Sequence, residues 1–173
     1  MIISWNTTKL CNLKCEHCYR DAGKKDPLEL TTEEGMALLD GISEAGFKII
    51  IFSGGEPLMR QDIFDLIAHA KSIGLRPVLG SNGTLFTQEI VRKLISSGIV
   101  RSGISLDSKN ALSHDAFRRQ DGAWQATINA MRICADEGLD FQVHTTVTKR
   151  NFNEITDITD FVIGLGAKAH HHG

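Results

Sequence analysis

Short apolar segments and longer amphipathic segments alternate five times along this chain, and this alternation limits the folds open to it. The short segments are rich in β-branched and aromatic residues, and residues 49–52 read Ile-Ile-Ile-Phe. The longer segments repeat apolar residues three or four positions apart, which is the helical period. Strands that alternate with helices form β/α units, because a parallel connection needs a long crossover. The chain is therefore predicted to be an α/β protein built on one parallel sheet.

Threonine and glycine residues mark the expected ends of these elements. Thr31 or Thr32 is expected to cap the first helix, and Thr87 the third. The continuous apolar run at residues 49–52 is typical of a strand covered on both faces. The expected strands are residues 2–7, 48–53, 76–81, 101–106 and 141–147, with a sixth beginning near Lys168, and the expected helices end near Gly46, Gly74, Gly98, Gly138 and Gly166.

The composition is typical of one ordinary domain with a sizeable core. The 173 residues are 42% hydrophobic and 23% charged with a formal net charge of −2, so there is no basic excess for nucleic acid. No apolar run approaches a membrane span, and residues 1–5 lack the features of a secretory signal. The sequence therefore predicts a cytoplasmic protein whose partners include neither nucleic acid nor membrane.

Polar and glycine-rich clusters follow the expected strands at one end only. In parallel β/α folds, the loops at the carboxyl ends of the strands build the active site. The clusters that fall there are Cys11, Cys15 and Cys18; Gly54, Gly55 and Glu56; Ser81, Asn82 and Gly83; Ser105 and Asp107; and Thr145 and Thr146. The sequence therefore predicts one functional rim.

Three cysteines in the pattern Cys11-x3-Cys15-x2-Cys18 are the strongest chemical signal on this rim. A closed zinc site takes four protein ligands, and an electron-transfer iron–sulfur cluster usually takes four cysteines. A cup of three thiolates therefore leaves one position of a metal centre open. The spacing differs from both ferredoxin patterns, and Tyr19 stands where a c-type haem site has histidine. The remaining cysteine, Cys134, lies on an apolar helical stripe and is interpreted as a small buried hydrophobe.

Two motifs in this order resemble the radical S-adenosylmethionine (SAM) superfamily. One is the C-x3-C-x2-C cup, and the other is the Gly-Gly-Glu-Pro at residues 54–57. The flanks at residues 4–8 and 19–23 are similar to the branch that modifies tetrapyrroles in haem biosynthesis. The resemblance implies a partial parallel (β/α) barrel. Residues 1–173 would be the radical SAM core, with five units and the start of a sixth, truncated before the sixth unit and the C-terminal remainder.

The resemblance also implies the cofactors and the reaction. Cys11, Cys15 and Cys18 would hold a 4Fe–4S cluster that an external donor such as ferredoxin or flavodoxin reduces. Cleavage of SAM would give a 5′-deoxyadenosyl radical that takes hydrogen from the substrate. The branch implies decarboxylation or deacetylation of a haem precursor. Peptide-modifying and cofactor-maturing members share part of the flanks and form the alternative.

The Gly54-Gly55-Glu56 motif would hold the amino group of SAM. The two glycines allow close approach of the backbone to a ligand, and Pro57 favours an extended Glu56 with its carboxylate available. An ordinary glycine turn is the alternative interpretation. Five further positions match SAM contacts of the family only by resemblance. They are His17 near the adenine, Ser105 or Asp107 at the ribose, Asn82, and Arg118 near the carboxylate.

Each of these residues also has a structural interpretation. His17 is a conceivable fourth ligand of a zinc knuckle, Asn82-Gly83 fits a tight turn, and Arg118 with Arg119 fits a solvated pair. An iron–sulfur electron carrier or a zinc-binding module is the alternative of another class. Neither needs Gly54-Gly55-Glu56 or Asp107.

The remaining histidines and basic residues have weaker interpretations. His69, His114 and His144 have no partner spacing and receive no role. Residues 170–172 are three histidines, either native or a purification remnant, which alternate sides on a strand and cannot all face one metal. The basic residues around the cysteines are candidates to receive an acidic donor or substrate carboxylates, with a solvated face as the alternative; they are Lys9, Lys14, Arg20, Lys24 and Lys25.

Overall fold

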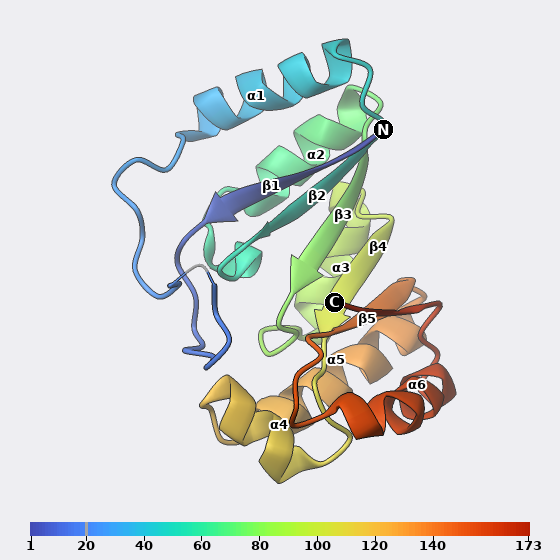
Figure 1. The fold of residues 1–173 in the computed structure, drawn as a ribbon. Helices are drawn as coiled ribbons and strands as arrows, with labels where there is room; N and C mark the ends of the chain where they lie inside the picture. Colours follow the sequence, from blue (N-terminus) through green and yellow to red (C-terminus); the bar gives the residue numbers. More distant parts are fainter. Residues whose placement is uncertain (20) are drawn as a thin grey trace.

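The computed structural model describes residues 1–19 and 21–173 and contains a six-stranded sheet in which neighbouring strands are parallel. The strands lie side by side in chain order and turn progressively from β1 to β6 (Figure 1). Their bounds are β1 Ile2–Thr8, β2 Ile49–Gly54, β3 Arg76–Ser81, β4 Arg101–Ser105, β5 Phe141–Thr145 and β6 His170–His172. The predicted α/β class and its parallel sheet are confirmed.

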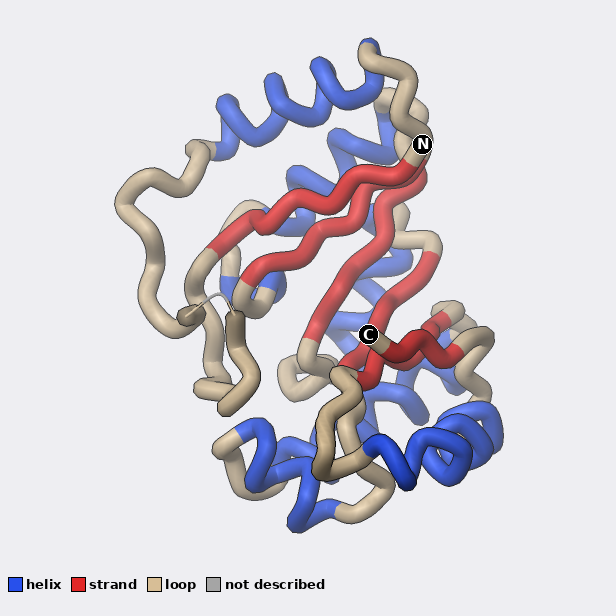
Figure 2. The backbone as a smooth tube through the Cα atoms, in the orientation of Figure 1, coloured by secondary structure: helices blue, strands red, loops and turns tan. Residues whose placement is uncertain are grey.

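The helices cover one face of this sheet (Figure 2). They are α1 Thr32–Glu44, α2 Ile63–Ser72, α3 Gln88–Ser97, α4 Ala111–Arg118, α5 Ala123–Glu137 and α6 Ile155–Gly164, with the short 3-10 helices η1 Pro57–Met59 and η2 Phe152–Glu154. Ile50 and Phe52 of β2 point to the helices and are fully buried, whereas Ile51 is half-buried and lines a cavity. The expectation that residues 49–52 are covered on both faces is therefore wrong, because the helices pack on one side only.

The ends of the predicted helices follow from local capping. The Thr31 hydroxyl accepts the N–H of Glu34, and the Glu34 carboxylate accepts the N–H of Thr31, which forms a capping box at the start of α1. Thr87 caps α3 by accepting the N–H of Ile90 at 3.2 Å. Gly98 ends α3 with φ at +105°, a conformation that costs glycine little. These ends match the sequence prediction.

The helix α4 was not predicted from the apolar pattern. It has eight residues, and Leu112 is 81% exposed, so its buried stripe is short. A capping signal does precede it, because the side chain of Asn110 accepts the N–H of Ser113 at 3.0 Å. This helix matters for function because it brings Phe117 and Arg118 to the rim.

Two strands end earlier than predicted, β4 at Ser105 and β5 at Thr145. Beyond β5, the N–H of Thr146 donates to the Asp107 carboxylate at 3.1 Å. On the side that faces β4 a side chain thus replaces the backbone ladder, whereas on the other side the Val147 N–H donates to the Gly173 carbonyl at 2.9 Å. Within the described residues no helix is long and apolar enough to cross a membrane.

The three histidines of residues 170–172 form β6 and pair with β5. The two ring nitrogens of His170 are hydrogen-bonded to the hydroxyls of Thr145 and Thr159, both at 2.7 Å. His171 instead stacks on His144, with ring centroids 5.2 Å apart. Neighbouring histidines therefore alternate sides, as predicted for a strand.

Candidate functional site

The carboxyl ends of the strands surround a cavity of about 430 Å³. It lies on the sheet face that the helices leave free, and both rim loops and inward-pointing strand residues line it. Its polar lining includes Cys11, Cys15, His17, Cys18, Ser53, Ser81, Asn82, Ser105, Arg118, Gln142, His144 and Thr146. Gly54 and Gly55 also line it, whereas Glu56 and Asp107 do not. Most of the residues predicted for the rim therefore share one hollow.

The three cysteines lie in the loop after β1 and are half-buried. Three N–H donors approach their sulfur atoms. The Leu13 N–H lies 3.4 Å from Cys11 Sγ, Asn82 Nδ2 lies 3.9 Å from the same sulfur, and Arg118 Nη1 lies 3.7 Å from Cys15 Sγ. Burial raises the pKa of the Cys11 thiol, and the Leu13 N–H opposes this by stabilising the thiolate. Such donors also tune a bound cluster.

This donor set fits a cluster held by three cysteines. Cys134 lies fully buried on α5, and burial raises its pKa to about 12, so it is no fourth ligand. In a cluster each cysteine binds its own iron, whereas the ligands of one zinc ion must crowd into a single coordination sphere. Within residues 1–19 and 21–173, no three His, Cys, Asp or Glu side chains are grouped to hold a single ion. The structure thus gives the zinc-knuckle alternative no support.

The motif Gly54-Gly55 needs glycine because the cysteine loop packs directly on it. A Cβ atom on Gly55 would collide with the carbonyl of Leu10, and one on Gly54 with the carbonyl of Thr8. The Gly55 N–H donates to the Thr8 carbonyl at 2.7 Å, and the next N–H, of Glu56, donates to Leu10 at 2.8 Å. The motif therefore has two roles: it lines the cavity, and it holds the cysteine loop in place.

Glu56 has the extended backbone predicted from Pro57, with φ −126° and ψ 109°. Its carboxylate is fully buried and accepts the Ser81 hydroxyl at 2.9 and 3.0 Å, the Asn82 N–H at 2.9 Å and the Leu58 N–H at 3.2 Å. The expectation of an available carboxylate is therefore wrong, because these donors replace water around it. Desolvation raises the pKa of Glu56 to about 7, against the lowering effect of these hydrogen bonds.

Asn82 and Gly83 form a tight turn after β3, as the structural interpretation predicted. Gly83 has φ at +81°, and the Asn82 side-chain oxygen accepts the N–H of Thr84 at 2.8 Å. The same side chain donates to Asn12 at 3.0 Å and faces the sulfur of Cys11. The turn is therefore part of the site, because it places the Asn82 side-chain amide against the cysteine loop.

Arg118, which lines the cavity, forms a buried ion pair with Asp107 behind it. Arg118 Nε and Nη2 donate to Asp107 Oδ2 at 2.7 and 2.6 Å, and the two side chains are 8% and 2% exposed. The other carboxylate oxygen accepts the Thr146 N–H, while the Asp107 N–H donates to His114 Nδ1 at 3.2 Å. Burial, with the Arg118 charge second, lowers the pKa of His114 to about 4, so this ring is neutral and can accept.

This pairing corrects two expectations. Asp107 is saturated by its partners and does not line the cavity, so of the two ribose candidates only Ser105 faces it. The interpretation of Arg118 and Arg119 as a solvated pair is also wrong, because Arg118 is buried and only Arg119 is exposed. The reason lies in α4, which turns Arg118 inward and ends at Arg119 with φ at +52°.

His17 lines the cavity and stacks on Phe117, with ring centroids 4.1 Å apart and an angle of 13° between the rings. Its buried Nδ1 has no hydrogen-bond partner among the described residues. Burial lowers the pKa of His17, and the nearby Arg118 lowers it further. A neutral ring with a free nitrogen is suited to pack beside a flat, polar ligand.

The sequence prediction missed residues on the inner face of the sheet. Gly80, Gly103, Gln142 and His144 all line the cavity, and a Cβ atom on Gly103 would meet the His144 ring at 2.8 Å. Strand alternation was the available signal, because residues at spacing two share a face. Arg20 was named as a basic candidate and lies outside the described residues.

Comparison with known proteins identifies the family. The family model described as the radical SAM superfamily matches residues 5–162. The AdoMet-dependent heme synthase of Nitratidesulfovibrio vulgaris is 42% identical over 98% of this chain and 47% of its own length. The Fe-coproporphyrin III synthase of Methanosarcina barkeri is 40% identical over 93% of this chain and 40% of its own.

A solved structure shares the fold. Streptococcus suis SuiB bound to S-adenosylmethionine superposes with a TM-score of 0.84 at 19% identity, over 99% of this chain and 39% of SuiB. The chain spans about half the length of the curated relatives that it matches. The predicted partial barrel and the predicted cofactors are confirmed by these matches. This chain belongs to the radical SAM superfamily, whose members are enzymes that use a 4Fe–4S cluster and S-adenosylmethionine.

Proposed function

We propose that this chain is the catalytic core of a radical SAM enzyme that removes carbon dioxide or acetate from the side chains of a haem precursor. The observation that carries the proposal is sequence similarity, because relatives at 40 to 42% identity are named for haem or Fe-coproporphyrin synthesis. Residues 1–173 form the core in this proposal, and a further segment covers the substrate. Maturation of a peptide is the alternative.

Cys11, Cys15 and Cys18 hold the cluster in this proposal and leave one iron for SAM. The cluster and SAM together supply a carbon radical that abstracts hydrogen, and an external one-electron donor provides the reducing equivalent. Asn82 and Arg118 donate toward the sulfur atoms of Cys11 and Cys15, which supports thiolate ligation at these positions. The protein's part is to orient the reacting groups and to keep water away from them.

The wall of the cavity suggests where SAM lies. The backbone at Gly54 and Gly55 approaches its amino group, and Ser105 bonds the ribose. His17 packs beside the adenine, where its unpartnered Nδ1 is available to a polar edge. The positive charge of Arg118 favours the SAM carboxylate. Glu56 acts behind this wall, where it holds Asn82 in place.

The cavity extends along the inner face of the sheet, and we propose that the substrate enters there. Gly80 and Gly103 carry no side chains, and the cavity reaches Gln142 and His144 on β5. A hydrogen atom on a carboxylated side chain of the substrate would approach SAM from this direction. These polar groups suit a substrate with carboxylates, and this supports a tetrapyrrole over an apolar one.

A chimera tests the proposal. Residues 1–173 replace the matched 47% of the Nitratidesulfovibrio vulgaris synthase, and the cluster is reconstituted anaerobically. The assay supplies SAM, a strong reductant and Fe-coproporphyrin III, and mass spectrometry follows haem and 5′-deoxyadenosine. A chimera with Cys15→Ala is the matched control. Residues 1–173 alone should release 5′-deoxyadenosine slowly with little haem, because substrate positioning is worth roughly 7 to 11 kcal/mol in oriented reactions.

Four outcomes separate the parts of the proposal. Haem formation by the chimera, absent in the Cys15→Ala control, supports a tetrapyrrole enzyme. Formation of 5′-deoxyadenosine without haem would leave a radical SAM core and overturn the decarboxylation of Fe-coproporphyrin III. Absence of both products would overturn the assignment of the cofactor site. Full conversion by residues 1–173 alone would overturn the proposal that a further segment orients the substrate.

A further inference from the structure

The cysteine loop has a second, outer side that the cavity does not use. A hollow of about 800 Å³ lies there, and both Cys15 and Cys18 line it, as they also line the inner cavity. Cys11 lines the inner cavity only. A centre held by these thiols is therefore reachable from outside without crossing the SAM side.

Basic side chains surround this outer hollow. We define the outer basic surface by the residues that line it, which are Lys9, Lys14, Lys24, Lys25 and Arg119. Three acidic residues, Glu16, Asp21 and Asp26, share the hollow with these five cations, and Glu16 is paired with Arg150 at 2.8 and 2.9 Å. The surface therefore carries an excess of positive charge on a chain whose formal net charge is −2.

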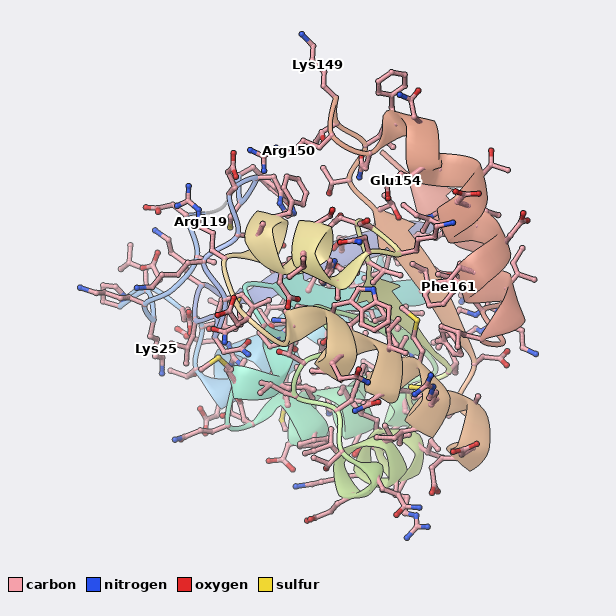
Figure 3. All side chains as sticks on the ribbon, turned by 90° about the horizontal axis from the view of Figure 1, so that it is seen from below. Lys25, Arg119, Lys149, Arg150, Glu154 and Phe161 are labelled. Carbon is pink, nitrogen blue, oxygen red and sulfur yellow. The ribbon has the colours of Figure 1, made fainter. Side chains whose placement is uncertain are left out.

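The cations of this surface are available to a partner. None of the five forms an ion pair within 4.0 Å in the described chain, although the charge of Lys25 acts on Glu29 and lowers the pKa of that carboxyl. Arg60, Arg92 and Lys109, in contrast, are paired with Asp62, Glu137 and Asp157. Four of the five belong to the segments around the cysteines. The fifth, Arg119, comes from the end of α4 and lies on the same side of the molecule as Lys25, away from Phe161 on α6 (Figure 3).

Backbone contacts hold the surface together. The Glu16 N–H donates to the Phe117 carbonyl at 3.0 Å, which ties the cysteine loop to α4. The Gly23 N–H donates to the Lys9 carbonyl at 2.9 Å, which ties the following segment to the end of β1. The segments that carry the cations are therefore hydrogen-bonded to the segments that carry the cysteines.

We infer that an acidic one-electron carrier protein docks on the outer basic surface and delivers its electron through the Cys15 and Cys18 side of the loop. The inference rests on the proposed function in one respect, that these cysteines hold the cluster. The carrier is oxidised by one electron and the cluster is reduced by one, with no proton transferred. Charge complementarity favours this partner, because a positively charged surface repels basic carriers and attracts acidic ones.

Charge reversal tests the inference. Lys24→Glu/Lys25→Glu changes the outer basic surface without touching a cysteine. Lys48→Glu/Lys71→Glu makes the same change in net charge on exposed residues at the opposite end of the strands, before β2 and at the end of α2. Stopped-flow absorbance measures the reduction of the reconstituted cluster by fully reduced flavodoxin at low salt. Reduced methyl viologen, a small cation, serves as the second reductant.

The expected result is specific to one variant and one reductant. The rate constant with flavodoxin should fall about tenfold or more in Lys24→Glu/Lys25→Glu, stay near wild type in the control, and lose this difference at high salt. Methyl viologen should reduce both variants at least as fast as the wild type. Equal flavodoxin rates in all three proteins, or an equal fall in the control, would overturn the inference.

Two further outcomes have distinct meanings. Lost binding of Fe-coproporphyrin III in Lys24→Glu/Lys25→Glu, with an unchanged flavodoxin rate, would assign the surface to substrate carboxylates and overturn electron delivery. A wild-type protein that holds no cluster reducible by methyl viologen would overturn the proposed function and, with it, this inference.

Discussion

Arg118 donates two hydrogen bonds of 2.6 and 2.7 Å to one carboxylate oxygen of Asp107, and both side chains are buried. The same guanidinium lies 3.7 Å from the sulfur of Cys15. The ion pair thus connects the end of β4 to the cysteine loop through α4. The Arg118 guanidinium therefore lies between the Cys15 sulfur and the Asp107 carboxylate that pairs with it.

Removing one partner of this pair should be costly. Arg118→Ala leaves the Asp107 carboxylate buried and unpaired, so the free energy of unfolding should fall by about 3 to 5 kcal/mol. Arg92→Ala is the matched control, because it breaks a pair with Glu137 in which the arginine is 64% exposed, and it should change little. Urea unfolding measures both. Similar losses in the two variants would contradict a structural role for the buried pair.

Gly55→Ala should disrupt the cysteine loop. The new Cβ atom would lie 2.8 Å from the Leu10 carbonyl carbon, so the backbone before Cys11 must shift. We expect lower stability and a reconstituted cluster at a fraction of the wild-type iron content. Gly41→Ala in α1 is the control, since nothing lies within 4 Å of its Cβ and the helix should gain about 0.5 to 1 kcal/mol. Full cluster content in Gly55→Ala would show that the loop tolerates the displacement.

The buried Glu56 should make stability depend on pH. Its pKa is raised to about 7 from 4.5, so between these values the folded protein holds a proton that the unfolded chain has released. Stability from this group therefore falls as the pH rises from 4.5 to 7, by up to about 3 kcal/mol. The contribution of His114 to stability has the opposite sign and increases as the pH rises from 4 to 6.5. Its pKa is lowered to about 4, so in this range the unfolded chain binds a proton that the folded protein does not.

The comparison with Glu56→Gln isolates the Glu56 contribution, because His114 is common to both proteins. The stability of the wild type relative to Glu56→Gln should decline as the pH rises through this window and then become constant. Urea unfolding of the chain without added iron, at a series of pH values, measures the difference. Parallel curves for the two proteins would contradict the raised pKa.

Each of Cys11→Ala, Cys15→Ala and Cys18→Ala should abolish the reconstituted cluster. The three thiols are the ligands that the cavity offers, so the loss of one leaves an iron without protein ligation. Cys134→Ala should retain the cluster, because that thiol is buried on α5 away from the cavity. Iron analysis and the visible absorbance of the cluster measure all four. Loss of the cluster in Cys134→Ala would favour a four-cysteine centre.

The sequence predicted the sheet well because its strands are marked locally. Residues 49–52 are apolar and β-branched, and the capping residues Thr31 and Thr87 lie where the helices begin. The helix α4 escaped prediction because its buried residues are His114, Phe117 and Arg118, so an apolar repeat does not mark it. Local pattern therefore explains both the correct elements and the missing one.

The site was predicted as a set of residues but not as a set of contacts. Glu56 and Asp107 were both named, yet their carboxylates point to partners that are 25 and 11 positions away in sequence, Ser81 and Arg118. Spacing along the chain gives the end of the sheet on which a residue lies. It does not give the direction of a side chain, which depends on which donors the fold brings within reach.

The hydrogen bonds of Glu56 fasten the turn after β3 to the loop after β2, and Asp107 fastens the loop after β4 to that after β5. Between these two halves of the rim, the cysteine loop bonds to both, through Asn82 on one side and Arg118 on the other. The cysteine loop therefore joins the two halves of the rim. Disorder in this loop would remove both of these contacts, so the order of the cysteine loop and the shape of the rim depend on each other.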